Sequence, residues 1–184
     1  MLFILSYPIF HPLLSHFTFI DFFGGITISI IGLDTATVTG VGILQNGIYS
    51  TTIFNLKVSH KNNSHGEKYR VMWDNLTKLI HSVQDPHVVF ELRSYSINRT
   101  TDRFLDGLSA IVILVCELNS IPYFGVYPTQ WRKLVFEGVT YPKRSKEFKL
   151  WVVPYAEKTF HLGNLTHDQA EALFITMYGG QIEW

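Results

Sequence analysis

The sequence predicts one α/β domain, built on a mixed five-stranded sheet with helices on its flanks. Three consecutive segments rich in Ile, Val and Thr predict antiparallel strands, and Asn46-Gly47 is a strong turn signal between the second and third. After residue 66, helical patterns alternate with apolar strands, which is typical of a parallel sheet. With 184 residues, 47% of them hydrophobic, the chain can bury a sizeable core and is not a disordered protein.

The first three strands are expected at residues 26–34, 38–45 and 48–57. Asn46-Gly47 should join the second and third as a two-residue hairpin. A polar loop then leads to a helix near residues 66–83. Its apolar residues recur at helical spacing: Val71, Met72, Leu76, Leu79, Ile80 and Val83.

The segment PHVVFELRS predicts a short buried strand that ends at Glu91. A helix should follow at residues 101–119, with Thr100 or Thr101 as its cap. IPYFGVY is the expected fifth strand, and Pro128 suits the first turn of the next helix.

Two further helices are expected after residue 140. Ser145 should cap the first of them, and Pro154 should kink or end it. The last helix should run from near Thr166 to about Met177, where Gly179-Gly180 stops it.

Residues 1–25 are strongly apolar, but prolines, histidines and an aspartate interrupt them. They contain no Lys or Arg, which argues against a secretory signal and a transit peptide. A membrane-spanning helix needs about 20 unbroken apolar residues, which this segment does not supply. We therefore expect residues 1–25 to be a poorly ordered or loosely packed extension before a domain at 26–184. A membrane anchor is the alternative.

The formal net charge is zero, which by itself argues mildly against nucleic-acid binding, but the cations are unevenly distributed. Residues 132–149 carry only two acids beside six cations: Arg132, Lys133, Lys143, Arg144, Lys146 and Lys149. This segment is either a basic binding face or a solvated helix surface. The single cysteine, Cys116, excludes an intrachain disulfide and a thiolate metal cluster, and we expect a buried, inert thiol.

Four carboxylates stand out by their positions. Asp34 and Glu91 each end an apolar strand, and these two strands should be parallel neighbours. Asp168 and Glu171 lie three residues apart on the last helix, so their Cβ atoms should be about 5 to 6 Å apart on one face. If the four converge, they need a cation, and carboxylate oxygens favour Mg²⁺ or Mn²⁺ over zinc.

Each acid also has a purely structural interpretation. Asp34 could be a turn residue, and Glu91 a helix cap or an ion-pair partner. Asp168 suits the first turn of a helix, where the helix dipole favours a negative charge. The order of the four acids along these elements favours a shared site.

Four segments together are similar to a known family: IIGLDTATVTGVGIL, VVFELRSYS, IPYFGVYPTQWRKLVFEGVTYPKRSKEFK and HDQAEAL. From about Ile26 to Tyr178 the chain resembles the RuvC-type Holliday-junction resolvases of the ribonuclease H-like superfamily, in particular their divergent phage and viral members. Two departures are visible. Thr35-Ala36 stands where the family often has Pro-Gly, and His167 adjoins Asp168 and could compete for its role.

The resemblance implies a ribonuclease H-like sheet and a metal-dependent endonuclease that resolves four-way DNA junctions by paired phosphodiester hydrolysis. It implies that Asp34, Glu91, Asp168 and Glu171 are catalytic and hold two Mg²⁺ ions, with Mn²⁺ as a substitute and His167 as an alternative ligand. Such an enzyme would work in the cytoplasm or wherever DNA is replicated.

The resemblance also implies partners. The six cations of residues 132–149 would bind DNA phosphates, and Tyr95 would stack on an unpaired base, with core packing as the alternative for Tyr95. A four-way junction has near two-fold symmetry, which favours a homodimer. The apolar helix at 104–118 is the expected interface, although burial in its own domain would explain the same pattern.

Three other functions compete with this interpretation. A sugar-kinase or actin-like phosphate-binding protein needs two domains, which 184 residues cannot supply. A non-catalytic junction-binding protein would not need all four acids. A ribonuclease H-like nuclease that acts on flaps, other branched DNA or RNA hybrids is not separated from a resolvase by sequence.

Overall fold

The computed structural model describes residues 28–57, 64–93 and 99–184, except for the side chains of residues 99–101. The predictions for the extension at 1–25 and for Tyr95 therefore lie outside the described residues. Within the described part of the chain, no helix is long and apolar enough to cross a membrane.

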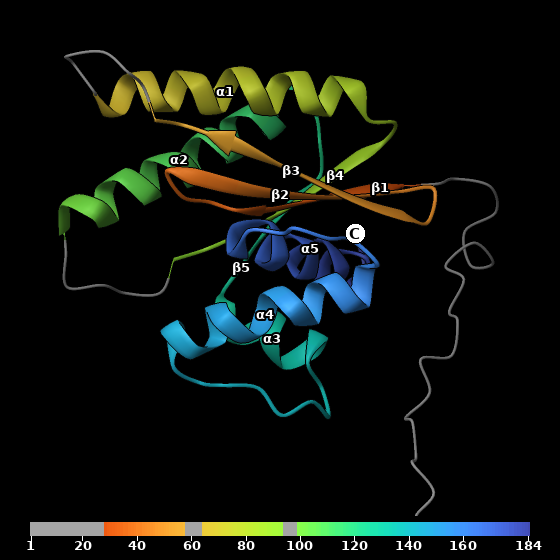
Figure 1. Cartoon of the computed structure of the whole chain (residues 1–184). Coiled ribbons are helices and arrows are strands. Elements are labelled where there is room, and N and C mark those ends of the chain that lie inside the picture. Colours follow the sequence, from red (N-terminus) through yellow and green to blue (C-terminus); the bar gives the residue numbers. More distant parts are fainter. Residues whose placement is uncertain (1–27, 58–63, 94–98) are drawn as a thin grey trace, which may run out of the picture.

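The sheet has the predicted mixed topology, with strand order β3-β2-β1-β4-β5 (Figure 1). Its first three strands are antiparallel: β1 (Ser29–Asp34), β2 (Val38–Gln45) and β3 (Ile48–Asn55). The other two, β4 (Pro86–Glu91) and β5 (Tyr123–Val126), extend the sheet in parallel from β1.

Helices cover both faces of this sheet (Figure 1). One face carries α1 (His65–Ser82) and α2 (Arg99–Leu118). The other face carries α3 (Pro128–Val135), α4 (Ser145–Phe160) and α5 (His167–Gly179). The five-stranded α/β prediction is confirmed.

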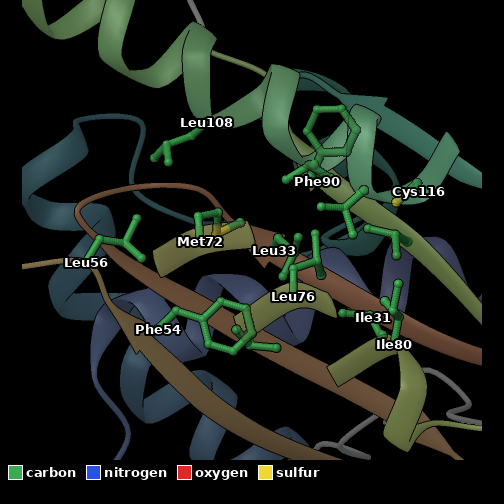
Figure 2. Close-up of a cluster of buried hydrophobic side chains, with 14 of the residues drawn as sticks. Ile31, Leu33, Phe54, Leu56, Met72, Leu76, Ile80, Phe90, Leu108 and Cys116 are labelled. Atoms are coloured by element: carbon green, nitrogen blue, oxygen red, sulfur yellow. The ribbon is translucent and has the colours of Figure 1, made fainter. Parts of the chain in front are cut away.

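Successive side chains of β1 point to opposite faces of the sheet and pack into two separate cores. Ile31 and Leu33 pack under α1 and α2, in the cluster shown in Figure 2. Ile30 points the other way, into the cluster formed with α3, α4 and α5. Cys116 is buried in the first core, so the prediction of a buried thiol is confirmed, and burial raises the pKa of this thiol to about 12.

Local chemistry sets most element ends. Asn46 and Gly47 both have positive φ angles, as the tight hairpin turn requires. The third strand ends at Asn55 and not at 57, because the Asn55 side chain accepts a hydrogen bond from the Lys57 backbone and turns the chain. Helix α2 begins at Arg99, so placing its cap at Thr100 or Thr101 was wrong: both lie inside its first turn.

Helix α4 differs from the prediction at two points. Its N-cap is Arg144, so Ser145 is the first helical residue and not the cap. The helix also does not end at Pro154 but continues to Phe160. A proline removes only one backbone donor, and buried side chains on both sides of it, Val152 and Ala156, pack both halves onto the core.

Candidate active site

The strand pairing places the first two acids side by side. In the parallel pair β1–β4, Leu33 lies opposite Phe90. Asp34 and Glu91 are the next residues of the two strands, so both lie at the carboxyl edge of the sheet. The neighbourhood predicted for these strands is confirmed.

The other two acids come from the first turns of α5. Its start is defined by a reciprocal cap, in which Thr166 accepts from the Gln169 backbone and the Gln169 side chain accepts from the Thr166 backbone. Asp168 and Glu171 follow directly, and α5 lies against β1 and β2. Glu171 is only 5% exposed.

A glycine lets this helix come close enough to Asp34. Gly40 on β2 is the residue paired with Asp34. A Cβ at this position would overlap the backbone carbonyl of Asp168. A Cβ at Gly32 or Gly42 would likewise overlap Thr176, further along the helix. The absence of side chains at these sheet positions therefore places the first turn of α5 next to the end of β1.

The electrostatics show that the four acids share one environment. Burial raises the pKa of Asp34 well above its ordinary value, and Glu91, Glu171 and Asp168 raise it further. The pKa of Glu91 is also raised, to about 7, first by burial and then by Glu171. Carboxylates that repel one another in this way call for a nearby cation.

Helix α3 supplies two donors to this cluster. Trp131 Nε1 donates to Glu91 Oε2 at 2.7 Å, and this hydrogen bond lowers the pKa of Glu91 against the effect of burial. The next residue, Arg132, donates from Nη2 to Glu171 Oε2 at 2.8 Å. Trp131 was not predicted as a site residue, since a tryptophan on an amphipathic helix is typical of a core position.

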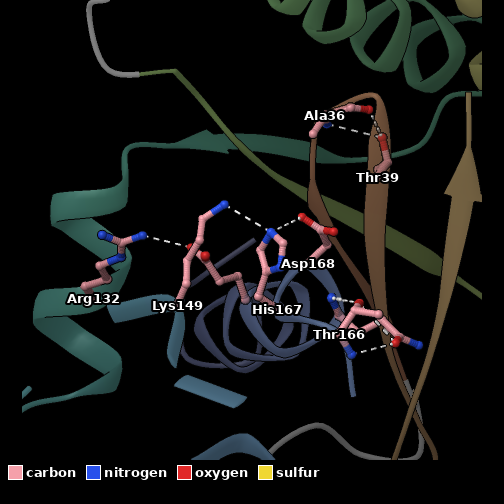
Figure 3. Close-up of polar contacts among 9 residues, drawn as sticks. Ala36, Thr39, Arg132, Lys149, Thr166, His167 and Asp168 are labelled. Atoms are coloured by element: carbon pink, nitrogen blue, oxygen red, sulfur yellow. Dashed lines mark hydrogen bonds and ion pairs between the residues drawn. The ribbon is translucent and has the colours of Figure 1, made fainter. Parts of the chain in front are cut away.

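Lys149 and His167 lie at the N-terminal end of α5 (Figure 3). His167 Nε2 is 3.0 Å from Lys149 Nζ and 3.0 Å from Asp168 Oδ1. One ring nitrogen can accept from the ammonium or donate to the carboxylate, but not both. Lys149 also lowers the pKa of both Asp34 and Glu91, so its charge reaches the acids.

The other predicted DNA-binding residues lie away from these contacts. Lys133, Lys143, Arg144 and Lys146 are exposed on α3, on α4 or in the segment that joins them. Lys143 Nζ stands 3.7 Å from the centre of the Tyr141 ring, and Arg144 is 3.5 Å from Glu147 in an exposed ion pair. Of the six predicted cations, Arg132 and Lys149 are the two whose charge reaches the acids.

The donor set fits a hard divalent cation in its chemistry. Asp34, Glu91, Asp168 and Glu171 offer only carboxylate oxygens, which select Mg²⁺ or Mn²⁺ over zinc. Within the described residues, no three His, Cys, Asp or Glu side chains are gathered closely enough to hold one ion in this conformation. The four acids are the residues that could ligate such an ion. In this conformation two of them, Glu91 and Glu171, accept hydrogen bonds from side chains of α3.

Comparisons with known proteins bear on the fold. No protein-family model matches the sequence, and no curated protein matches it. Among solved structures, it is similar to T. thermophilus RuvC in complex with a Holliday junction substrate. The TM-score is 0.61 at 14% identity, over 82% of this chain and 91% of that one. A second T. thermophilus RuvC structure matches with a TM-score of 0.59 at 14% identity, over 82% of this chain and 92% of that one. These TM-scores, over most of both chains, and the mixed five-stranded sheet show that this chain has a RuvC-like, ribonuclease H-like fold.

Proposed function

We propose that this protein is a structure-specific endodeoxyribonuclease that depends on Mg²⁺ or Mn²⁺ and resolves four-way DNA junctions. The observation that carries the proposal is geometric: the parallel strands β1 and β4 end at Asp34 and Glu91, and Gly40 lets the first turn of α5, with Asp168 and Glu171, approach the same edge. The three other acids add to the effect of burial in raising the pKa of Asp34. The RuvC-like fold supports the same substrate class by analogy.

In the proposed reaction, Asp34, Glu91, Asp168 and Glu171 would together hold the divalent ions at the carboxyl edge of the sheet. Such ions, when bound, activate a water nucleophile and stabilise the leaving 3′-oxygen. Trp131 keeps the Glu91 carboxylate in a fixed orientation through its hydrogen bond of 2.7 Å. Lys149 carries a positive charge beside the acids, where a scissile phosphate would arrive.

The exposed cations Lys133, Lys143, Arg144 and Lys146 would bind phosphates of the DNA arms. Tyr95 stays a candidate for base stacking. The domain at 26–184 would carry the activity without residues 1–25. The protein would act wherever its cell or host replicates DNA.

A homodimer would bring two active sites to the two opposed strands of a junction. Helix α2 packs one side into its own core, through Phe104, Leu108, Val112 and Val115. Its outer side exposes Leu114 at 46% and Leu118 at 65%, and we propose this side as the dimer contact.

The first test is D34N, assayed on a synthetic four-way junction beside flap and duplex substrates. The amide keeps the shape of the carboxylate but loses its charge, so cleavage should fall to the level of the protein-free control while junction binding stays nearly intact. D74N is the matched control, because Asp74 is 44% exposed on α1 and, among the described residues, forms an ion pair with Arg70 alone.

Wild-type cleavage should also stop in EDTA and return with Mg²⁺ or Mn²⁺. Full activity of D34N, or activity in EDTA, would contradict the proposal. Binding without cleavage in the wild type would point to a non-catalytic junction-binding protein. Preferential cleavage of flaps would point to a nuclease for other branched DNA.

A further inference from the structure

Arg132 has a contact in this structure that phosphate binding does not require. Its Nη2 donates to Glu171 Oε2 at 2.8 Å, and the two side chains are 23% and 6% exposed. Such a charge-assisted hydrogen bond is stronger than a neutral one, and screening by solvent is weak where one partner is buried. The anion that this guanidinium contacts is thus one of the four acids.

The rest of the guanidinium is held by aromatic rings. Its Cζ lies 4.0 Å from the centre of the Phe148 ring and 5.0 Å from that of the Trp131 ring. Its Nε is buried and has no hydrogen-bond partner among the described residues. A single carboxylate oxygen and two ring faces therefore hold the charge, without the two parallel hydrogen bonds that make arginine–carboxylate pairs rigid.

The position of this charge matters to the whole cluster. Phe148 and Trp131 belong to the buried aromatic core, so the guanidinium cannot move far without leaving its ring contacts. The charge of Arg132 also lowers the pKa of Glu91, so its field extends beyond Glu171. A divalent cation that binds these acids must therefore break the hydrogen bond of Arg132 to Glu171, while the ring contacts keep the guanidinium nearby.

We propose that Arg132 is a positioning residue that serves as the resident counter-cation of Glu171, and that a divalent cation must displace it from this carboxylate to bind. The inference rests on the proposed metal-dependent function. It gives Arg132 a role at the acids in place of the phosphate contact expected from the sequence. Without a divalent ion, Arg132 offsets part of the repulsion among the acids. With the ion, the same charge weakens binding.

The test is calorimetric titration of Mn²⁺ into the full-length protein without DNA. R132M keeps a side chain of similar length against Phe148 and Trp131 but removes the charge and the hydrogen bond. We expect R132M to bind Mn²⁺ on the order of tenfold more tightly than the wild type, because a nearby like charge is removed. R132K keeps the charge and should bind Mn²⁺ as the wild type does.

K133M is the matched control, because Lys133 is the adjacent, exposed cation and its loss changes the net charge equally. Thermal unfolding gives a second measurement. In EDTA, R132M should melt at a lower temperature than K133M, and Mn²⁺ should raise its melting temperature more than that of the wild type. If R132M binds Mn²⁺ no more tightly than K133M, the inference is wrong.

The two proposals fail differently. Mn²⁺ binding that tightens in R132M, in a protein that cleaves no branched DNA, would support the counter-cation role and contradict the nuclease. Junction cleavage that needs metal, with equal Mn²⁺ affinity in R132M and K133M, would support the nuclease and contradict the counter-cation role. If the wild type and R132M both bind no Mn²⁺, both proposals are contradicted. If R132M does not fold in EDTA, R132Q takes its place with the same expected result.

Discussion

The two faces of the sheet are packed by different kinds of side chain. The face under α1 and α2 is an apolar core dominated by Leu, Ile and Val (Figure 2). The face under α3, α4 and α5 is rich in aromatic rings, with Phe136 at the centre of a network whose members lie 4.8 to 6.0 Å from it: Trp131, Tyr141, Phe148, Trp151, Tyr155 and Phe174. The acids lie at the edge of this second face.

The two faces also differ in the side chains that lie between the sheet and its helices. On the first face, large side chains such as Leu33, Leu76 and Leu108 fill the space between sheet and helices. On the second face, Gly32, Gly40 and Gly42 leave no side chain between the sheet and α5. One face is thus built for burial, and the other for bringing a helix to the end of a strand. We therefore expect substitutions on the first face to change stability and those on the second to change activity.

Among substitutions that leave the four acids in place, the largest effect on activity should come from G40A. A methyl group there overlaps the Asp168 carbonyl, so the first turn of α5 must move away from Asp34. Junction cleavage should fall close to background, with a stability loss of about 1 to 3 kcal/mol from overpacking. G163A is the matched control, because a Cβ at Gly163 meets nothing within 4 Å. Normal cleavage by G40A would show that the close approach is not needed.

On the first face, L108A should act on stability alone. Leu108 is fully buried between α2 and the rest of its core, so its removal should cost about 2 to 5 kcal/mol in the free energy of unfolding. The cleavage rate per folded molecule should not change. L150A on α4 removes a side chain that is 74% exposed and lies outside the proposed dimer contact, so it should stay within about 0.5 kcal/mol. Urea unfolding measures both, and a cleavage defect in folded L108A would contradict the division between the faces.

The acids should make stability depend on pH when no divalent ion is present. The pKa of Glu91 is about 7 in the folded protein and 4.5 in its ordinary state, so between these values the folded chain holds a proton that the unfolded chain has released. The free energy of unfolding should therefore decrease as pH rises from 4.5 to about 7, by up to roughly 3 kcal/mol from this group. Asp34 should act in the same direction.

Urea unfolding in EDTA at pH 5, 6 and 7 measures this slope. E91Q should flatten it, while D74N on the first face should leave it unchanged. A wild-type slope that E91Q does not reduce would mean that Glu91 titrates normally.

The smallest effect concerns the exposed cations. Changing Lys143 and Lys146 to Ala should reduce the slope of log affinity against log salt for a four-way junction by about two, roughly one for each phosphate that is no longer neutralised. Lys149 stays in place, because its charge reaches the acids. The matched control changes Lys57 and Lys78, two exposed lysines outside the basic segment, and should leave the slope unchanged. Equal slopes in both variants would mean that Lys143 and Lys146 contact no phosphate and are only part of a solvated surface.

Much of this protein is determined locally and is visible in the sequence. Asn46-Gly47 specifies a hairpin by its φ angles, Thr166 and Gln169 specify a helix start by their reciprocal cap, and Pro128 starts α3. Asp34 and Glu91 could be predicted as neighbours because parallel strands end at the same edge. Such features depend on residues a few positions apart, or on rules that hold for every sheet.

Only the tertiary structure decided how the acids are held. Trp131 and Glu91 are 40 positions apart, and Arg132 and Glu171 are 39 apart. No periodic pattern links such pairs, because their contact depends on how α3 and α5 pack around one aromatic core. The role of Gly40 is likewise invisible in a strand pattern, since it depends on which helix lies above it. Local hydrogen bonds and hydrophobic periodicity select the elements, whereas side-chain packing between distant segments selects which charges meet.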